Sequence, residues 1–431
     1  MEKLHVKKIE SIEEIRVEVP GSKSITNRAL LLAALSNKRC VLKGVLFSSD
    51  SRAFLDSLKK LGFEVQEDEI NQTVILQGTG GIIPKNRATI NVQSAGTAAR
   101  FLTVMLALAG GEYEIQASPQ MCKRPMQPLL DVLKKSGVIF KWLGEEGHFP
   151  FFMSAHSVEL KETVIDTGVS SQFASALLMS GTLLKQDLTL ELVGDRTEGS
   201  YIKMTLAMME QFGIPFERKG NKYRVFHSDC YGIEEYQVEP DVSGACYFYA
   251  MAPLLRTRVQ VANVHLDSLQ GDIKFVEALG KMGCEISEDT NGVVVSGKHL
   301  KEYPGLTISM KDFSDQTMTM AAIAPFASSP TLICNVGHIR FQESDRIHAI
   351  VTELKRMGIS CEEVPEEEGI RILPGEISGA EIETYEDHRM AMAFTLPGLK
   401  TGNITILNPE CCRKTFENFF ELIEQLYDHN I

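Results

Sequence analysis

GSKSITNRALLLAAL, residues 21–35, is the first of six similar stretches whose repetition decides the fold. The others are SAGTAARFLTVMLAL from Ser94, VSSQFASALLMSGTLL from Val169, DVSGACYFYAMAPLL from Asp241, DFSDQTMTMAAIAPFA from Asp312 and YEDHRMAMAFTLPGL from Tyr385. Each opens with small, capping or charged residues and continues as a helix rich in Ala, Leu and Met. The starts lie 71 to 75 residues apart. This spacing predicts six structural units of about 72 residues each.

Each unit also contains a second helix and short β-rich runs. Five of these helices end near a glycine, which suits a left-handed helix C-cap: Gly62, Gly137, Gly213, Gly283 and Gly358. The sixth copy, KTFENFFELIEQLY, runs into the C-terminus. Runs such as LTLELV and hairpin patterns such as CEISEDTNGVVVSG predict a strand–helix–strand–helix–strand–strand unit. The first helices are apolar nearly all round, so we expect them at the domain centres.

The chain of 431 residues is too long for one hydrophobic core. Proline and glycine punctuation at 19–21 and 239–241 divides the units three and three. We therefore expect one lobe at 21–239 and a second lobe at 1–20 plus 240–431. The N-terminal strand is then left to pair with the second lobe, and two short linkers predict a hinge.

The composition limits the possible partners. The net charge is −13, from 57 acidic and 44 basic side chains, so a general basic field for nucleic acid is missing. No stretch approaches the roughly 20 apolar residues of a membrane span. Nine cysteines show no disulfide or zinc spacing, and the start of the chain has no signal-like apolar run. We expect a reduced, cytoplasmic protein that binds neither nucleic acid nor membrane.

Polar residues collect at the starts of the repeat helices, where free N–H groups favour anions. In the segment 23–28, Lys23 lies at the N-terminal end of the expected helix, and Ser24 and Arg28 share one helical face. Ser170, Ser171 and Gln172 supply two hydroxyls and an amide at the third helix start. For the first segment the alternative is a capped helix with solvated charges. At the third helix start, simple N-capping explains one serine but not all three side chains.

Further charged residues are spread over both predicted lobes. Arg124 lies in a Lys-Arg-Pro-Met run that we expect to open the second helix of its unit, and it could bind a carboxylate or phosphate through two hydrogen bonds. Small residues at 94–99 allow close approach by a ligand, although tight packing explains them equally well. In the second lobe, Glu343 and Arg346 lie one turn apart; Asp315, His388, Arg389 and Lys414 add to them. Surface salt bridges are the alternative for any one of these residues.

The motifs resemble a known family. PGSKSITNRALLLAAL, SAGTAARFLT, KRPMQPLLDVLKKSG, VSSQFASALL, SDQTMTMAAI, ESDRIHAIVTELKRMG, YEDHRMAMAF and NPECCRKTFENFF are similar, in order and over nearly the whole chain, to signatures of the EPSP synthase family of enolpyruvyl transferases. The resemblance implies an α/β fold. It would be a two-lobed inside-out α/β barrel of six βαβαββ units, three per lobe, with helices inside.

The resemblance also implies the reaction. The enolpyruvyl (1-carboxyvinyl) group of phosphoenolpyruvate would pass to the 5-hydroxyl of shikimate 3-phosphate, and phosphate would leave from a tetrahedral intermediate. This is a step of the shikimate pathway to chorismate and the aromatic amino acids, and the target of glyphosate. No phosphorus–oxygen cleavage is required, so we expect neither metal nor cofactor. A monomer is expected.

The resemblance assigns roles to individual residues. The positions that match the shikimate 3-phosphate site are Lys23, Ser24, Arg28, Ser170, Ser171, Gln172, Tyr201, Asp315 and Gln342. Those that match the phosphoenolpyruvate site are Lys23, Gly96, Arg124, Gln172, Arg346, Arg389 and Lys414. The expected catalytic residues are Asp315, Glu343, Lys23, His388 and Lys414. Glu343 would protonate the methylene carbon and Asp315 would take the hydroxyl proton, while cations stabilise the leaving phosphate. Gly96 is the expected determinant of glyphosate sensitivity.

Four positions depart from the family pattern. Gln342 stands where lysine is common, Glu198 where a serine is often found, and Ser94 and His338 each replace a frequent asparagine. Gln342 and Glu198 remove a cation and add an anion near the expected sugar phosphate. The sugar would then be held differently, or the acceptor would be another molecule.

Two rival functions remain open at this point. An enolpyruvyl transferase acting on UDP-N-acetylglucosamine shares the fold, but its reactive cysteine lies several residues before an Arg-Pro pair. Here Cys122 lies only two residues before Arg124. The other rival is a non-catalytic repeat scaffold or metabolite-binding paralogue, against which Asp315, Glu343 and the two cation sets argue.

Overall fold

The computed structural model describes residues 2–168, 170–194, 196–228 and 230–428. Val169, the first residue of the third repeat segment, lies outside them. The chain divides into two compact units: unit A is Gly21–Val238, and unit B is Met1–Pro20 with Glu239–Ile431. Glu239 was expected at the end of the first lobe, but it belongs to unit B. Its carboxylate accepts hydrogen bonds from Ser268 Oγ at 2.6 Å and Leu269 N at 3.2 Å.

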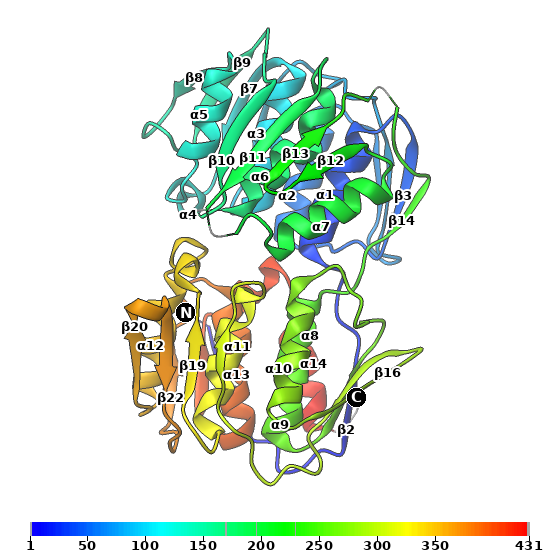
Figure 1. Cartoon of the computed structure of the whole chain (residues 1–431). Helices are drawn as coiled ribbons and strands as arrows, with labels where there is room; N and C mark the ends of the chain where they lie inside the picture. The colour runs from blue at the N-terminus through cyan, green and yellow to red at the C-terminus, as the bar shows by residue number, and fades with distance from the viewer. Residues whose placement is uncertain (1, 169, 195, 229, 429–431) are drawn as a thin grey trace. The chain divides into compact units, whose positions relative to one another are not determined.

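Unit A alternates helices and strands (Figure 1). Its helices are α1 (Lys23–Leu35), α2 (Ser49–Lys60), α3 (Gly96–Ala109), α4 (Pro119–Cys122), α5 (Gln127–Lys135), α6 (Ser171–Ser180) and α7 (Ser200–Gln211), with the 3-10 turn η1 (Gly181–Leu183). Its strands are β3 (Arg39–Lys43), β4 (Val65–Asp68), β5 (Thr73–Gln77), β6 (Arg87–Asn91), β7 (Gly111–Gln116), β8 (Ile139–Trp142), β9 (Phe151–Ala155), β10 (Glu162–Asp166), β11 (Leu188–Val193), β12 (Phe216–Lys219), β13 (Lys222–Val225) and β14 (Glu235–Gln237).

Unit B repeats the same alternation. Its helices are α8 (Val242–Tyr249), α9 (Met251–Leu255), α10 (Lys274–Lys281), α11 (Thr317–Ile323), α12 (Arg346–Arg356), α13 (His388–Thr401) and α14 (Phe419–Tyr427). Its 3-10 turns are η2 (Gly271–Ile273), η3 (Ser314–Gln316), η4 (Ala324–Phe326), η5 (Gly337–Phe341), η6 (Pro365–Glu367) and η7 (Pro409–Lys414). Its strands are β1 (Lys3–Val6), β2 (Glu14–Val17), β15 (Arg258–Val261), β16 (Glu285–Asp289), β17 (Gly292–Ser296), β18 (Thr307–Ser309), β19 (Thr331–Cys334), β20 (Cys361–Val364), β21 (Gly369–Ile372), β22 (Ala380–Ile382) and β23 (Ile404–Leu407).

The strands form small sheets built on one plan. In the sheet β6-β7-β9-β8, β6 and β7 are parallel, and β9 and β8 follow as antiparallel strands. The sheet β10-β11-β13-β12 in unit A and the sheet β18-β19-β21-β20 in unit B have the same order and directions. In each of these sheets the first helix of the unit connects the two parallel strands along the chain, as a βαβ connection requires. The repeats inferred from the sequence are therefore structural repeats.

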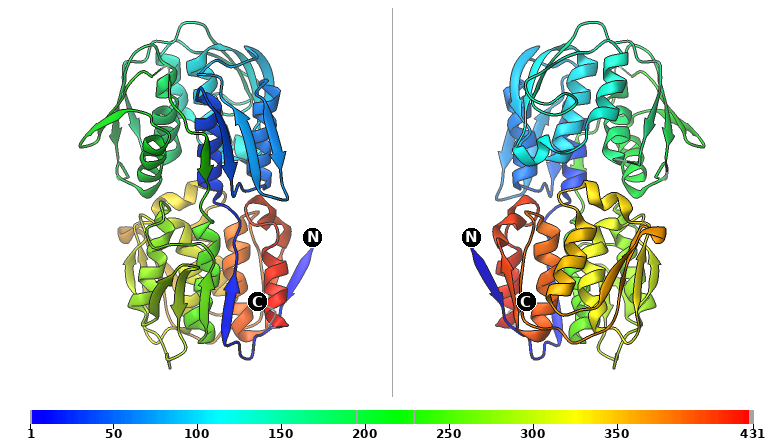
Figure 2. Two further views of the ribbon diagram at one scale, coloured as in Figure 1. Left: turned by 90° about the vertical axis from the view of Figure 1, so that its right-hand side faces the viewer. Right: turned by 90° about the vertical axis from the view of Figure 1, so that its left-hand side faces the viewer.

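Strands distant in the sequence complete the remaining sheets. In unit A, β14 pairs in parallel with β3, so the last strand of the unit completes its first repeat. In unit B, β2 pairs in parallel with β15, and β1 pairs antiparallel with β23. Figure 2 shows these two N-terminal strands in blue beside later elements of unit B. The sixth repeat ends in α14 rather than in a hairpin, and its sheet is β1-β23-β22.

The first helix of each repeat lies in the core. In unit A, α1, α3 and α6 contact one another, and α1 is buried from Ile25 to Leu35. In unit B, α13 contacts both α8 and α11. Helices that are apolar on all sides avoid water only when they are buried at the centre of a unit. This confirms the expected α/β fold of repeated units, six of them within the described residues. Among the helices of the described part of the chain, none is long and apolar enough to cross a membrane.

Candidate active site

Unit A places a lysine and a carboxylate side by side at two helix starts. Ser22 caps α1, and Lys23 follows as its first residue. Lys23 Nζ lies 3.4 Å from Asp50 Oδ2, in the first turn of α2, and the Asp50 side chain is only 3% exposed. Asp50 is not among the residues expected from the sequence, although an acidic residue two positions after Ser48, the N-cap of α2, is a recognisable signal. A partly buried lysine with one carboxylate neighbour keeps donors available for an anionic ligand.

Arg28 is buried and joins α1 to α6 and α7. Its Nε donates to Thr205 Oγ1 at 2.8 Å, and Nη2 donates to Ser175 Oγ at 3.2 Å and Tyr201 O at 3.4 Å. Burial lowers the pKa of Arg28 to about 10. The aromatic ring of Tyr201 lies 5.8 Å from the guanidinium carbon of Arg28. The structure thus brings Arg28 and Tyr201 together, with the guanidinium engaged by protein acceptors. Their contact with a sugar phosphate stays a prediction.

Two predicted ligand-binding groups in unit A are buried with unused hydrogen-bonding capacity. Ser170 caps α6 by accepting from Gln172 N at 3.2 Å, and Ser171 is the first residue of the helix. Gln172 Oε1 and Arg124 Nε are buried and have no hydrogen-bond partner among the described residues. A buried polar atom without a partner costs about 1–3 kcal/mol, so each calls for an explanation. A bound polar ligand supplies one.

Arg124 lies against Gly96. A Cβ added to Gly96 would lie 2.7 Å from Arg124 Nη1 and 3.1 Å from Arg100 Nη1. Arg100, which is also not among the residues expected from the sequence, donates to Gly96 O at 3.3 Å and to Pro125 O at 3.2 Å, so it links α3 to the segment that carries Arg124. The expectation that Arg124 opens a helix is wrong: it lies between α4 and α5, which begins at Gln127. Pro125 follows Arg124, and a proline disfavours helical backbone at the residue before it, which explains the difference.

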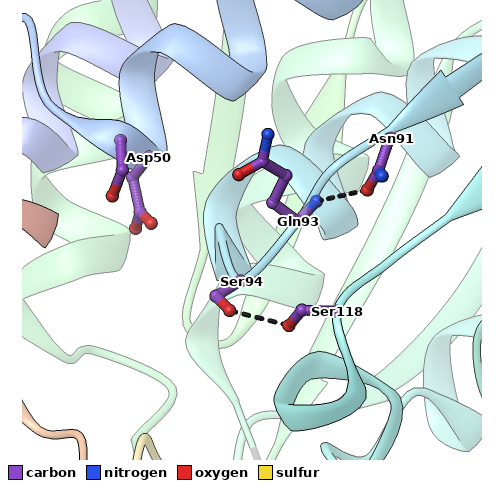
Figure 3. A pocket seen from close by; sticks show the side chains of 6 residues that line it. Asp50, Asn91, Gln93, Ser94 and Ser118 are labelled. Atoms are coloured by element: carbon purple, nitrogen blue, oxygen red, sulfur yellow. Dashed lines mark hydrogen bonds between the residues drawn. The ribbon is translucent and has the colours of Figure 1, made fainter.

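A polar pocket of about 210 Å³ lies beside these residues (Figure 3). Its lining residues are Ser49, Asp50, Asn91, Gln93, Ser94 and Ser118. Ser94 Oγ and Ser118 Oγ share a hydrogen bond of 2.7 Å, and Ser118 Oγ also accepts from Met121 N at 3.2 Å. Ser94, one of the four departures, therefore links the chain before α3 to the cap of α4, from which Arg124 follows.

Removing the Ser94 hydroxyl tests this link. We expect Ser94→Ala to lower the free energy of unfolding by about 1 kcal/mol, because the hydrogen bond to Ser118 is lost. A double-mutant cycle with Ser118→Ala, measured by urea unfolding, should give a coupling energy of about 0.5 kcal/mol or more. Strictly additive losses would show that the two hydroxyls do not stabilise each other.

Unit B centres on a buried arginine that binds several carboxylates. Arg346, the first residue of α12, is 1% exposed. Its Nε lies 2.8 Å from Asp387 Oδ2, Nη1 lies 3.0 Å from Asp315 Oδ1, and Nη2 lies 3.0 Å from Glu343 Oε2. Burial acts to lower the pKa of Arg346, but the three carboxylates more than offset it and raise that pKa. The predicted acid and base are therefore held by one guanidinium, and Asp387, which the sequence motifs do not single out, is a third carboxylate.

The other predicted cations of unit B lie around this centre. Arg389 Nη2 lies 2.8 Å from Asp315 Oδ2, so Asp315 is bound by two guanidinium groups. Lys414 Nζ lies 3.5 Å from Glu343 Oε1, and it is buried with no hydrogen-bond partner among the residues described. His388 is buried, with Nδ1 3.8 Å from Asp387 Oδ1. All the predicted site residues of unit B thus gather at the starts of α12 and α13 and on η3 and η7.

The other departures have local explanations. Gln342 Oε1 accepts a hydrogen bond from Arg346 Nη1, a role that a lysine could not fill. His338 Nε2 lies 2.8 Å from the Oγ of Ser314, the residue directly before Asp315 in the chain. Glu198 forms an ion pair with Arg218 on β12 and is mostly exposed. The added anion at Glu198 therefore has its own counter-ion.

Cys122 lacks the features of a reactive thiol. Partial burial raises its pKa, whereas a nucleophilic cysteine needs a lowered pKa. Its Sγ lies 3.9 Å from Ala117 O. This disfavours the rival in which Cys122 takes part in chemistry.

The fold and these groups define the class: an α/β enzyme of repeated units with cations and carboxylates at helix starts. A solved structure of EPSP synthase from Acinetobacter baumannii has the same fold, with a TM-score of 0.81 at 24% identity over 98% of both chains. The family model for EPSP synthase (3-phosphoshikimate 1-carboxyvinyltransferase) matches residues 6–423. The chain therefore belongs to the EPSP synthase family.

Curated relatives agree with this assignment. The 3-phosphoshikimate 1-carboxyvinyltransferase of Nostoc punctiforme is 42% identical over 95% of this chain and 96% of its own length. The chloroplastic enzyme of Petunia hybrida is 37% identical over 98% of this chain and 85% of its own length. The names of both specify 3-phosphoshikimate and a transferase, which favours the main interpretation over the UDP-sugar and non-catalytic rivals.

Proposed function

We propose that this protein transfers the enolpyruvyl group of phosphoenolpyruvate to the 5-hydroxyl of shikimate 3-phosphate and releases phosphate. The observation that carries the proposal is the Arg346 centre, in which Asp315 and Glu343 share one buried guanidinium. Addition followed by elimination needs one group to give a proton and another to take one. The family relation agrees with the substrates.

Asp315 and Glu343 take opposite roles. Asp315 is bound by both Arg346 and Arg389, which stabilises its charged form and suits it to accept the hydroxyl proton. Glu343 is bound by Arg346 and Lys414. A phosphoenolpyruvate anion held by the same two cations competes with Glu343 for them. This favours the neutral carboxyl, which protonates the methylene carbon.

The remaining predicted residues bind the two anions. Lys23, Gly96, Arg124, Gln172, Arg346, Arg389 and Lys414 contact phosphoenolpyruvate, and Lys23, Ser24, Arg28, Ser170, Ser171, Gln172, Tyr201, Asp315 and Gln342 contact shikimate 3-phosphate. The buried atoms Arg124 Nε, Gln172 Oε1 and Lys414 Nζ, which have no hydrogen-bond partner among the described residues, support the first group. Lys23, Arg124 and Lys414 stabilise the charge on the leaving phosphate, and His388 stays a catalytic candidate beside Asp387. A monomer and a cytoplasmic location stay predictions.

A phosphate-release assay tests the proposal. Turnover of phosphoenolpyruvate should require shikimate 3-phosphate, and UDP-N-acetylglucosamine should not replace it. Turnover with the UDP-sugar alone would establish the first rival. Retained binding without turnover of either acceptor would establish the second.

Replacing Gly96 by alanine tests the phosphoenolpyruvate site. The new Cβ meets the Arg124 guanidinium at 2.7 Å, so the arginine must shift. We expect the KM for phosphoenolpyruvate to rise about tenfold, equivalent to about 1.4 kcal/mol, with weaker inhibition by glyphosate. Gly280→Ala on α10 is the control, because its Cβ would meet only Ile286 at 3.5 Å. Equal effects of the two substitutions would contradict the assignment of Gly96.

A further inference from the structure

Asp272 is a buried carboxyl group of unit B that the proposed reaction does not use. It lies on η2 and is 7% exposed. Ser243 Oγ, on α8, donates a hydrogen bond to Asp272 Oδ2. Arg389 Nη2 donates to the same Ser243 Oγ at 3.5 Å and to Asp315 Oδ2 at 2.8 Å. A chain of polar contacts therefore runs from Asp272 through Ser243 to a predicted phosphoenolpyruvate ligand.

The electrostatic surroundings make this carboxyl sensitive to pH. The charged or titratable groups on the elements packed against η2 are Asp241, Cys246, Tyr247 and Tyr249 on or before α8, Asp315 on η3, and Lys274, Glu277 and Lys281 on α10, with His388 and Arg389 on α13 beyond Ser243. Lys274 is paired with Asp312 at 2.5 Å, and Glu277 and Lys281 are exposed. Burial, and next the charge of Asp315, raise the pKa of Asp272 to about 7, with Arg389 acting in the opposite direction. Near neutral pH the group is thus partly protonated.

We propose that Asp272, acting through Ser243, is a positioning residue for Arg389, and that its charge sets how strongly Arg389 holds an anionic substrate. The inference rests on the proposed function, in which Arg389 binds phosphoenolpyruvate. With Asp272 neutral, the Arg389 guanidinium is balanced mainly by Asp315 and attracts a further anion. With Asp272 ionised, a second negative charge behind Ser243 repels that anion and draws the guanidinium away from it.

The sign of the pH dependence follows from linkage. The neutral form of Asp272 binds the anion better, so binding favours protonation and takes up a proton near pH 7. As the pH rises above about 7, the ionised form prevails. The KM for phosphoenolpyruvate then increases, by at most about tenfold per pH unit for one linked proton. In Asp272→Asn, this carboxyl contributes no pH dependence. The amide oxygen can still accept from Ser243.

The test compares matched variants between about pH 6 and pH 9. We measure kcat and KM for phosphoenolpyruvate at saturating shikimate 3-phosphate in the wild type, in Asp272→Asn and in Asp289→Asn. Asp289 is an exposed carboxylate of the same unit that accepts from Gln260 Nε2 at 2.9 Å. Calorimetry with inorganic phosphate over the same range gives a second readout. Ionisation of the ligand itself is common to all variants, so only their differences are interpreted.

We expect the KM of Asp272→Asn to increase less above pH 7 than in the wild type, by about threefold or more at the highest pH, with kcat within about twofold. Asp289→Asn should follow the wild type. A slope retained in Asp272→Asn, as from His388, would overturn the proposal. Ser243→Ala is the second variant: its KM near pH 7 should rise about threefold, and an unchanged KM would also overturn it.

The proposed function and this inference can fail separately. A wild-type protein without turnover, but with phosphate affinity that depends on Asp272 as described, refutes the reaction and keeps the positioning role. Normal turnover with phosphate affinity that is indifferent to Asp272→Asn does the reverse.

Discussion

Replacing Glu343 by glutamine is expected to lower kcat about 10²-fold or more while KM for each substrate changes by less than about threefold. Glutamine has the size of glutamate and can still accept the hydrogen bond from Arg346 Nη2, which spans 3.0 Å in the wild type. It has no acidic proton to give to the methylene carbon. Steady-state phosphate release with both substrates measures the effect.

The matched control is Glu363→Gln on β20. Glu363 also binds an arginine, Arg340, but it lies outside the Arg346 centre. The turnover of Glu363→Gln should stay within about twofold of the wild type. If Glu343→Gln retains wild-type turnover, another residue is the proton donor. If its KM rises while kcat is kept, Glu343 acts in binding instead.

Replacing Arg346 by methionine is expected to lower the free energy of unfolding by about 3–5 kcal/mol. Methionine fills much of the same volume, but it leaves Asp315, Glu343 and Asp387 near one another without their shared cation. Removal of one partner from a buried ion pair costs more than the pair itself contributes, because uncompensated charges stay buried. Urea unfolding measures the loss.

Arg371→Met is the control for this prediction. Arg371 pairs with Glu362 at 3.2 Å in unit B, and both side chains are largely exposed. An exposed pair contributes at most about 1 kcal/mol, so the control should be nearly as stable as the wild type. Similar losses in the two variants would show that the Arg346 centre is not a special source of stability.

Much of the candidate site could be found from the sequence because its residues occupy equivalent places in the repeats. Glu343 and Arg346 are three residues apart in the chain, so their contact is local, although Glu343 lies in the bend before α12 rather than one helical turn away as expected. Asp387 could not be assigned in this way. It is 41 residues from Arg346, and only packing of the starts of α12 and α13 makes them partners.

The same distinction applies to the departures. The sequence showed that Gln342 replaces a common lysine, but not that its amide binds Arg346. It showed Ser94 in place of asparagine, but not the hydrogen bond to Ser118, 24 residues away. Each explanation needs the position of a partner that no local pattern predicts.

By itself, the sequence determined the repeats, the α/β class, the buried first helices and the cations at helix starts. These are properties of short segments, because hydrophobic periodicity and caps act over a few residues. Only the tertiary structure decided that β14 completes the first repeat, that β1 joins β23, and that Arg346 gathers three carboxylates. Such contacts join residues far apart in the chain, and their energies depend on packing and burial.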